Sequence, residues 1–173
     1  LLILAGVTFL YAFPFLPNNI QGKNLRAISG VKIYIIALVW SLVTVIVPLI
    51  NVEYSLDFDV WITVTQRFLF VLVLTLPFEI RDLKYDSLEL ATIPQKIGVK
   101  YTKVLGVCLL LFCFLLEYFK DVFQIETVMI SGSICGITAL FLLFSNERQR
   151  VYYSSFWVEG IPILWLLISY SIS

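Results

Sequence analysis

The sequence has no histidine, and charged residues make up only 14% of its 173 positions. Without histidine, the chain lacks the most common general base and zinc ligand of proteins. So few charged side chains exclude an ordinary soluble domain, because they cannot cover its surface. The net charge is zero, so nothing indicates a broad basic surface for nucleic acid.

Hydrophobic residues dominate instead, at 60% of the chain and a mean hydropathy of +0.95. We therefore predict an all-α fold, a multi-pass transmembrane helix bundle that forms a single domain over 1–173. Full spans are predicted at the apolar runs 31–50, 60–78, 101–119, 127–145 and 154–172, with Pro77 ending the second. The run 1–13 is too short to span, so it is predicted to complete a helix that begins earlier in a longer protein.

The three cysteines fall within apolar runs and have no metal-like spacing: Cys108, Cys113 and Cys135. They are predicted to be buried, unreactive thiols. Their positions indicate no disulfide framework.

Positive charges fall almost entirely in alternate loops. Lys120 is the exception, and Arg67 lies inside a span. The other ten Lys and Arg share one side: Lys23, Arg26, Lys32, Arg81, Lys84, Lys96, Lys100, Lys103, Arg148 and Arg150. The positive-inside rule places that side in the cytoplasm and the carboxyl terminus outside.

Residues 79–98 form the one long polar stretch between apolar runs. Placed on a helix, its acids are spaced to share one face: Glu79, Asp82, Asp86 and Glu89. Like charges at this spacing repel, so a cation is expected among them. Asp82 and Asp86 lie one turn apart and could hold Mg²⁺ together with substrate phosphate oxygens. A solvated cytoplasmic loop, with its acids offset by neighbouring Arg and Lys, is the alternative.

The order of residues in this stretch is more specific than the acids alone. Ile-Arg-Asp at 80–82 precedes Asp86, and Thr-Ile-Pro at 92–94 and Ile-Gly at 97–98 follow. This order resembles the second aspartate-rich motif of the UbiA family of membrane prenyltransferases. The resemblance implies a fold of nine transmembrane helices, of which this chain would match about the last six. The family's first aspartate-rich motif has no counterpart in this chain.

The resemblance also implies a reaction and its site. Asp82 and Asp86 would be catalytic and would coordinate Mg²⁺, which bridges the diphosphate of an isoprenoid donor. The prenyl group would pass to a lipophilic acceptor, such as an aromatic ring, within membrane lipid. Arg81 and Lys84 would grip the diphosphate, although compensation of the acids is an equal explanation for both.

Two further basic residues share the cytoplasmic side with this motif. Lys23 and Arg26 lie in the loop whose basic residues help to bind the diphosphate in UbiA-like enzymes. The positive-inside rule alone also explains them. The residues around Arg26, Lys32 and Trp40 are similar to those of bacterial members, which implies a multi-pass protein of the bacterial inner membrane.

Ionisable residues inside spans face a cavity or a partner by default. Glu159 lies near the cytoplasmic end of the last span, where it lines the pocket or reaches the surface. Glu79 is a second candidate pocket residue, and Arg67 is predicted to be structural.

Other functions stay open. Glu79 stands where many UbiA members carry Asn or Asp, and the glycine common after the second Asp is absent, so an inactive member is one alternative. A non-enzymatic protein, either a transporter or an assembly subunit, is another. Transporters typically have helices broken by Gly or Pro near the bilayer midplane. Here Pro162 is the one proline deep in a predicted span.

Overall fold

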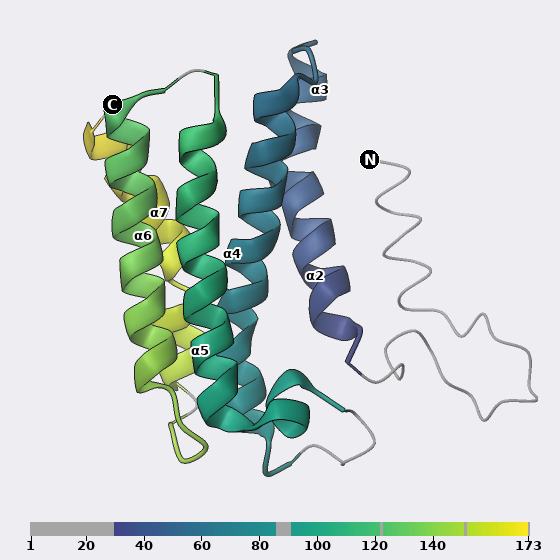
Figure 1. Ribbon diagram of the computed structural model, residues 1–173, viewed down its shortest axis with the longest axis vertical. Coiled ribbons are helices and arrows are strands. Elements are labelled where there is room, and N and C mark those ends of the chain that lie inside the picture. The colour runs from purple at the N-terminus through teal and green to yellow at the C-terminus, as the bar shows by residue number, and fades with distance from the viewer. Residues whose placement is uncertain (1–29, 86–90, 122, 151, 173) are drawn as a thin grey trace, which may run out of the picture.

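The computed structural model describes residues 30–85, 91–121, 123–150 and 152–172 (Figure 1). These residues form helices and turns and contain no strand. Four helical segments among them are long and apolar enough to cross a membrane: Lys32–Asn51, Phe58–Asp82, Ile93–Phe119 and Ile125–Phe144. The predicted all-helical, multi-pass bundle is therefore confirmed.

The first span is one helical segment with a wider turn in its middle. It consists of α2 (Lys32–Ser41), the π-helical turn η2 (Leu42–Ile46) and α3 (Val47–Asn51). Pro48 stands at the start of α3. It lacks the N–H that a regular α-helix would donate to the carbonyl of Thr44. The wider turn immediately before it accommodates this missing hydrogen bond.

The second span, α4 (Phe58–Asp82), is the central helix and the most buried of the four. Asp57 caps its start by accepting from the backbone N–H of Val60 at 3.1 Å. Pro77 lies inside α4, so the prediction that it ends the helix is wrong. Spanning helices tolerate proline in their interior. Separately, Gln149 donates from Nε2 to the Pro77 carbonyl at 2.7 Å, which joins the segment after α6 to α4.

The third span, α5 (Ile93–Leu115), continues into the short 3₁₀ turn η4 (Leu116–Phe119). Gly98 interrupts α5 with φ +78° and ψ 159°, and the first turn of α5 lies across the end of the bundle (Figure 1). Further along, Gly106 lets α5 approach its neighbours closely, because a Cβ there would overlap Leu142 and touch Leu76. The fourth span is α6 (Ile125–Phe144).

The last predicted span, 154–172, is not one continuous helix. It consists of the π-helical turn η5 (Tyr153–Val158) and α7 (Ile161–Ile172), separated by a turn at Glu159 and Gly160. Pro162 has no N–H to donate to Val158, which favours the break at this point. The prediction of five continuous spans is therefore wrong for the fifth.

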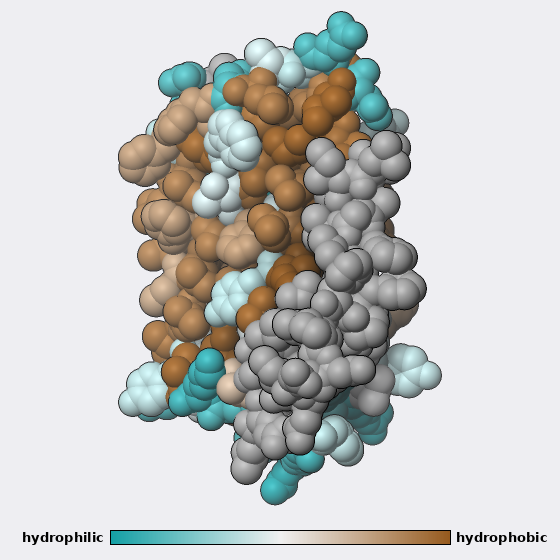
Figure 2. All heavy atoms as spheres, turned by 90° about the vertical axis from the view of Figure 1, so that its right-hand side faces the viewer, coloured by the Kyte–Doolittle hydropathy of each residue, from teal (hydrophilic) through white to brown (hydrophobic). Residues whose placement is uncertain are grey.

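The helices alternate in direction, so the connections gather at two ends (Figure 1). The basic end, as we call it, carries Arg81, Lys84, Lys96, Lys100, Arg148 and Arg150, and the opposite end carries Asp57, Asp59, Asp121 and Glu126. Figure 2 shows an apolar band between two hydrophilic ends on the face in view. Such a band is expected where a bundle meets lipid.

The core lies where α4 packs against its neighbours. Phe70, Leu76 and Ile80 of α4 belong to one buried cluster with Ile134 and Leu142 of α6. Cys113 and Cys135 are buried in the same cluster, as predicted. Cys108 is exposed, so the prediction of burial is wrong for it: its position on α5 turns it away from the core.

Candidate functional site

The polar stretch 79–98 is not one helix. α4 ends at Asp82, a turn follows in which the N–H of Tyr85 donates to the Asp82 carbonyl at 2.8 Å, and α5 begins at Ile93. Pro94 stands in the first turn of α5, where no N–H donor is needed. The prediction of one continuous helix through this stretch is therefore wrong, because α4 ends at Asp82. Asp86 and Glu89 lie outside the described residues.

Arg81 and Asp82 form a two-point ion pair at the end of α4. Nε of Arg81 lies 2.6 Å from Oδ1 of Asp82, and Nη2 lies 3.0 Å from Oδ2. The side chains are 19% and 37% exposed, respectively, so the pair is half-buried at the edge of the bundle. This arrangement fixes the plane of the guanidinium group.

The same guanidinium joins α4 to the last segment of the chain. Nη1 of Arg81 donates to the hydroxyl of Ser154 at 2.8 Å and to that of Ser155 at 3.3 Å. The ring of Phe78 lies beneath it, 5.4 Å from its central carbon. Arg81 of α4 is therefore held by Asp82, by the two serines of η5 and by the ring of Phe78.

Tyr153 anchors η5 on its other side. Its hydroxyl donates to the carbonyl of Phe141 in α6 at 2.7 Å. Burial raises the pKa of the Tyr153 phenol above its ordinary value, which keeps the donor protonated. The two serines that hold Arg81 thus belong to a segment that is itself fixed.

The other predicted site residues lie at different places relative to the Arg81–Asp82 pair. Glu159 stands at the break between η5 and α7 and interacts electrostatically with Arg81. Glu79 is half-buried, one turn before Asp82 on α4. Lys84 is exposed in the turn after α4. Lys23 and Arg26 lie outside the described residues.

An apolar cavity of about 460 Å³ adjoins the ion pair, between α2, α4 and the last segment. Phe78 connects the cavity with the ion pair, because it lines the cavity and its ring lies under Arg81. Its lining consists of Ile36, Trp40, Val71, Leu74, Thr75, Phe78, Glu159 and Pro162. Among the described residues of this lining, Glu159 is the one that carries a charge. The arrangement therefore places the Arg81–Asp82 ion pair next to an apolar chamber, with Phe78 between them.

The sequence did not identify Ser154, Ser155 or Phe78 as parts of this site. The two serines are separated from Arg81 by more than 70 residues. Their signal was a polar pair at the start of an otherwise apolar segment. Phe78 carried no signal, since the chain has 14 phenylalanines in apolar runs.

The chemistry of Asp82 fits one half of a magnesium site. Mg²⁺ in proteins is commonly held by one or two carboxylates together with substrate phosphates. Asp82 supplies one such carboxylate, while the other predicted ligand, Asp86, is not among the described residues. Within the described ranges, no group of three or more Cys, Asp or Glu side chains is arranged to hold a metal ion.

The chain was also compared with known proteins. No family model, curated protein or solved structure matches it. The resemblance to the UbiA family, which rests on residues 80–98, therefore stays a prediction.

Proposed function

We propose that this protein is a membrane-embedded enzyme that transfers a prenyl group from an isoprenoid diphosphate to a lipophilic, aromatic acceptor, with Mg²⁺ as cofactor. One observation carries the proposal: Phe78 both lies under Arg81 of the Arg81–Asp82 pair and lines an apolar cavity. A prenyl diphosphate has the matching shape, with a charged head and a long apolar tail. The UbiA-like order of residues 80–98 supports the same chemistry.

Each end of the donor has a place in this arrangement. Arg81 donates to the diphosphate, because its planar guanidinium matches phosphate oxygens, and Ser154 and Ser155 hold it in position. Lys84 adds charge at the same end. Asp82, with Asp86, would hold Mg²⁺, which supplies charge neutralisation of the leaving diphosphate when bound. The prenyl tail lies in the apolar cavity.

The cavity lining also suits the reaction centre. Breaking the carbon–oxygen bond to the diphosphate leaves an allylic cation, and the rings of Trp40 and Phe78 can stabilise it through their π faces. The acceptor carbon then forms the new carbon–carbon bond and loses a proton. Glu159, a charged residue of the lining, would accept that proton.

The location follows from the distribution of charge. Four spanning helices make this an integral membrane protein. We propose that the basic end faces the cytoplasm of a bacterial cell, because positive loops are retained there. The donor would then enter from the cytoplasmic side.

Pyrophosphate release tests the proposal. The full-length protein in lipid nanodiscs is supplied with a prenyl diphosphate, Mg²⁺ and a panel of lipophilic aromatic acceptors. We expect metal-dependent release that Asp82→Asn abolishes and Glu147→Gln preserves. Glu147 is the matched control, since it is an exposed carboxylate at the same end, outside the site. Full release in Asp82→Asn would overturn the proposal.

A non-enzymatic role, such as transport, has one observation in its favour: the break at Glu159 and Gly160 in the last segment. The same preparation separates the alternatives. Donor binding without release for any acceptor would indicate an inactive relative of such enzymes. Absence of donor binding would favour the non-enzymatic role.

A further inference from the structure

A second cavity, which we call the polar cavity, lies toward the end opposite the Arg81–Asp82 site. Its volume is about 350 Å³, and α4, α5 with η4, α6 and α7 enclose it. The side chains that bear on the argument are Arg67, Glu117, Lys120, Glu126, Trp165 and Ser169. A polar chamber among spanning helices requires an explanation, because burying unmatched polar groups is costly.

Arg67 is a charged residue of this cavity that has no described charge partner. It stands nine residues into α4, which is about 14 Å along the helix axis from its first residue. Its Nε is buried and has no hydrogen-bond partner within the part of the chain that the structure describes. No described carboxylate forms an ion pair with it. The guanidinium lies over the ring of Trp165, 4.0 Å from its centroid, which holds it without neutralising it.

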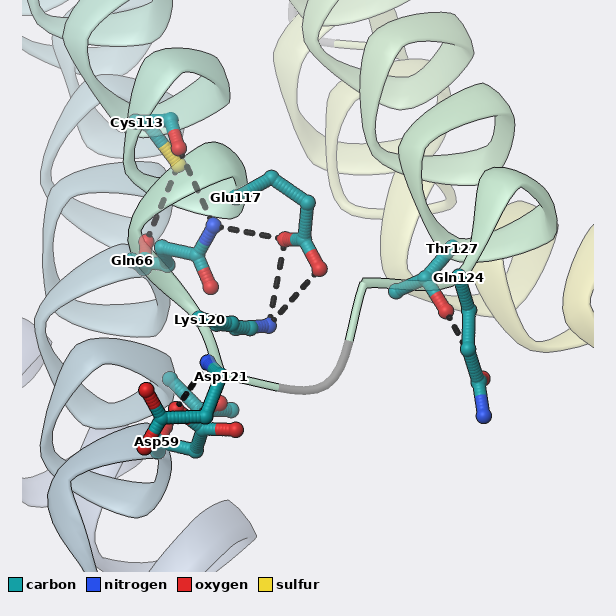
Figure 3. Close-up of polar contacts among 9 residues, drawn as sticks. Asp59, Gln66, Cys113, Glu117, Lys120, Asp121, Gln124 and Thr127 are labelled. Carbon is teal, nitrogen blue, oxygen red and sulfur yellow. Dashed lines mark hydrogen bonds and ion pairs between the residues drawn. The ribbon is translucent and has the colours of Figure 1, made fainter.

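Glu117, the buried acid of the same cavity, is already balanced. Figure 3 shows its carboxylate between two other side chains. Nζ of Lys120 lies 2.9 Å and 3.1 Å from its two oxygens, and Nε2 of Gln66 donates to it at 2.8 Å. The side chains of Lys120 and Glu117 are 14% and 6% exposed, so the pair is largely buried. Glu117 therefore cannot also serve Arg67.

The remaining described acids near Arg67 are either exposed at the rim of the cavity or already hydrogen-bonded. Glu126 is exposed on the first turn of α6, at the rim. Asp57 caps α4, and Asp59 accepts from the backbone N–H of Asp121 at 2.9 Å. Lys120 and Glu117 balance each other, so Arg67 has no buried acid as its partner among the described residues that line the cavity, and Glu126 is an exposed acid at the rim.

We infer that the polar cavity binds a singly charged oxyanion, a phosphodiester or a carboxylate, with Arg67 as its charge partner. The guanidinium group provides paired N–H donors that match two oxygens of such a group. Lys120 has three N–H donors, of which two point to Glu117, so one remains. Ser169 of α7 adds a hydroxyl on the facing wall.

The size of the cavity agrees with this ligand. A water molecule occupies about 30 Å³ in the liquid, so 350 Å³ accommodates a group of roughly ten heavy atoms. Both a soluble ion and the headgroup of an anionic lipid fit this description. The site is separate from the proposed reaction: fifteen residues of α4 place Arg67 roughly 22 Å from Asp82.

Binding by the full-length protein in neutral detergent provides the first arm of the test. Thermal unfolding is followed against dimethyl phosphate and against acetate, at constant ionic strength. We expect a saturable rise in melting temperature for the wild type and for Arg148→Gln, the matched control with an exposed arginine in the loop at the basic end. In Arg67→Gln the affinity falls by at least about tenfold, the loss of a charged hydrogen bond.

The second arm identifies a lipid source. The protein is reconstituted in nanodiscs of phosphatidylglycerol and phosphatidylcholine, and native mass spectrometry counts the lipids that it retains. Preferential retention of phosphatidylglycerol by the wild type and Arg148→Gln, lost in Arg67→Gln, assigns the site to a lipid headgroup. Binding of the soluble ions alone assigns it to a small anion.

Arg67→Lys keeps the test decisive if Arg67→Gln does not fold. This variant retains the charge but loses the paired donors, so we expect several-fold weaker binding. Binding unchanged in a folded Arg67 variant overturns the inference, and so does a wild type that binds neither ions nor lipid. Neither result depends on prenyl transfer, so the two proposals fail separately.

Discussion

Gln66 of α4 donates from Nε2 to Oε2 of Glu117 in η4 across 2.8 Å, within the bundle. The same nitrogen lies 3.1 Å from the carbonyl of Cys113, so one amide joins α4 to two turns of the neighbouring segment (Figure 3). Lys120 balances the charge of Glu117 from the other side. These contacts fasten the carboxyl end of α5 to the central helix where water does not compete.

Removing the carboxylate of Glu117 is therefore expected to destabilise the protein. Glu117→Ala leaves Lys120 as a buried charge without its partner, which typically costs about 3–5 kcal/mol. Chemical or thermal unfolding in detergent measures the loss. Adding Lys120→Met should restore part of the stability, because the orphaned charge is removed. Asp121→Ala, an exposed acid at the same end, serves as the control, and an equal loss there would contradict this account.

Gly98 is expected to tolerate no side chain. Its φ of +78° with ψ of 159° lies in a backbone region used almost only by glycine. Gly98→Ala should lower the free energy of unfolding by about 1–3 kcal/mol and disturb the start of α5. Gly136→Ala in α6 is the matched control, because a Cβ there meets open space and no positive φ is required. Equal stability of both variants would contradict the strain argument.

Arg81→Lys tests whether the shape of the guanidinium matters. A lysine supplies the charge but cannot contact Asp82 at two points and reach Ser154 as well. Under the proposed function, the affinity for a prenyl diphosphate should fall about tenfold, measured by direct binding in nanodiscs. Arg148→Lys should leave it unchanged. Equal affinity in the two variants would show that Arg81 contributes only its charge.

Labelling of single cysteines tests the orientation. Glu53→Cys and Glu147→Cys, each in a background without the three native cysteines, place one exposed thiol at opposite ends. If positive loops stay inside, an impermeant maleimide should label Glu53→Cys in intact cells and Glu147→Cys only after lysis. The reversed pattern would invert the proposed orientation. Labelling of both in intact cells would contradict opposite ends.

The apolar runs predicted four of the helices well. Their approximate positions follow from local composition, because about twenty apolar residues are enough to define a span. The ends were less certain: Pro77 looked like a stop, yet α4 continues past it to Asp82. The break at Gly160 was not predicted, although Glu159 and Pro162 stand beside it, because the run 154–172 as a whole is apolar enough to be read as one span.

The sequence likewise predicted one part of the site and not the rest. Asp82 and Arg81 were identifiable as neighbours in a polar stretch, but the contacts of Arg81 to Ser154 and Ser155 join segments far apart in the chain. Arg67 was predicted to be structural from its position in a span. The lack of a described partner became visible only once Glu117 was found paired with Lys120.

By itself, the sequence determined that this protein belongs in a membrane, that it crosses it as helices, and that positive charge collects at one end. These properties are local, because a backbone in lipid must satisfy its hydrogen bonds within each segment. The tertiary structure alone decided which side chains meet: Arg81 with Ser154, Gln66 with Glu117, and Arg67 with Trp165. Such contacts depend on how each helix is rotated and packed against its neighbours, which local composition does not specify.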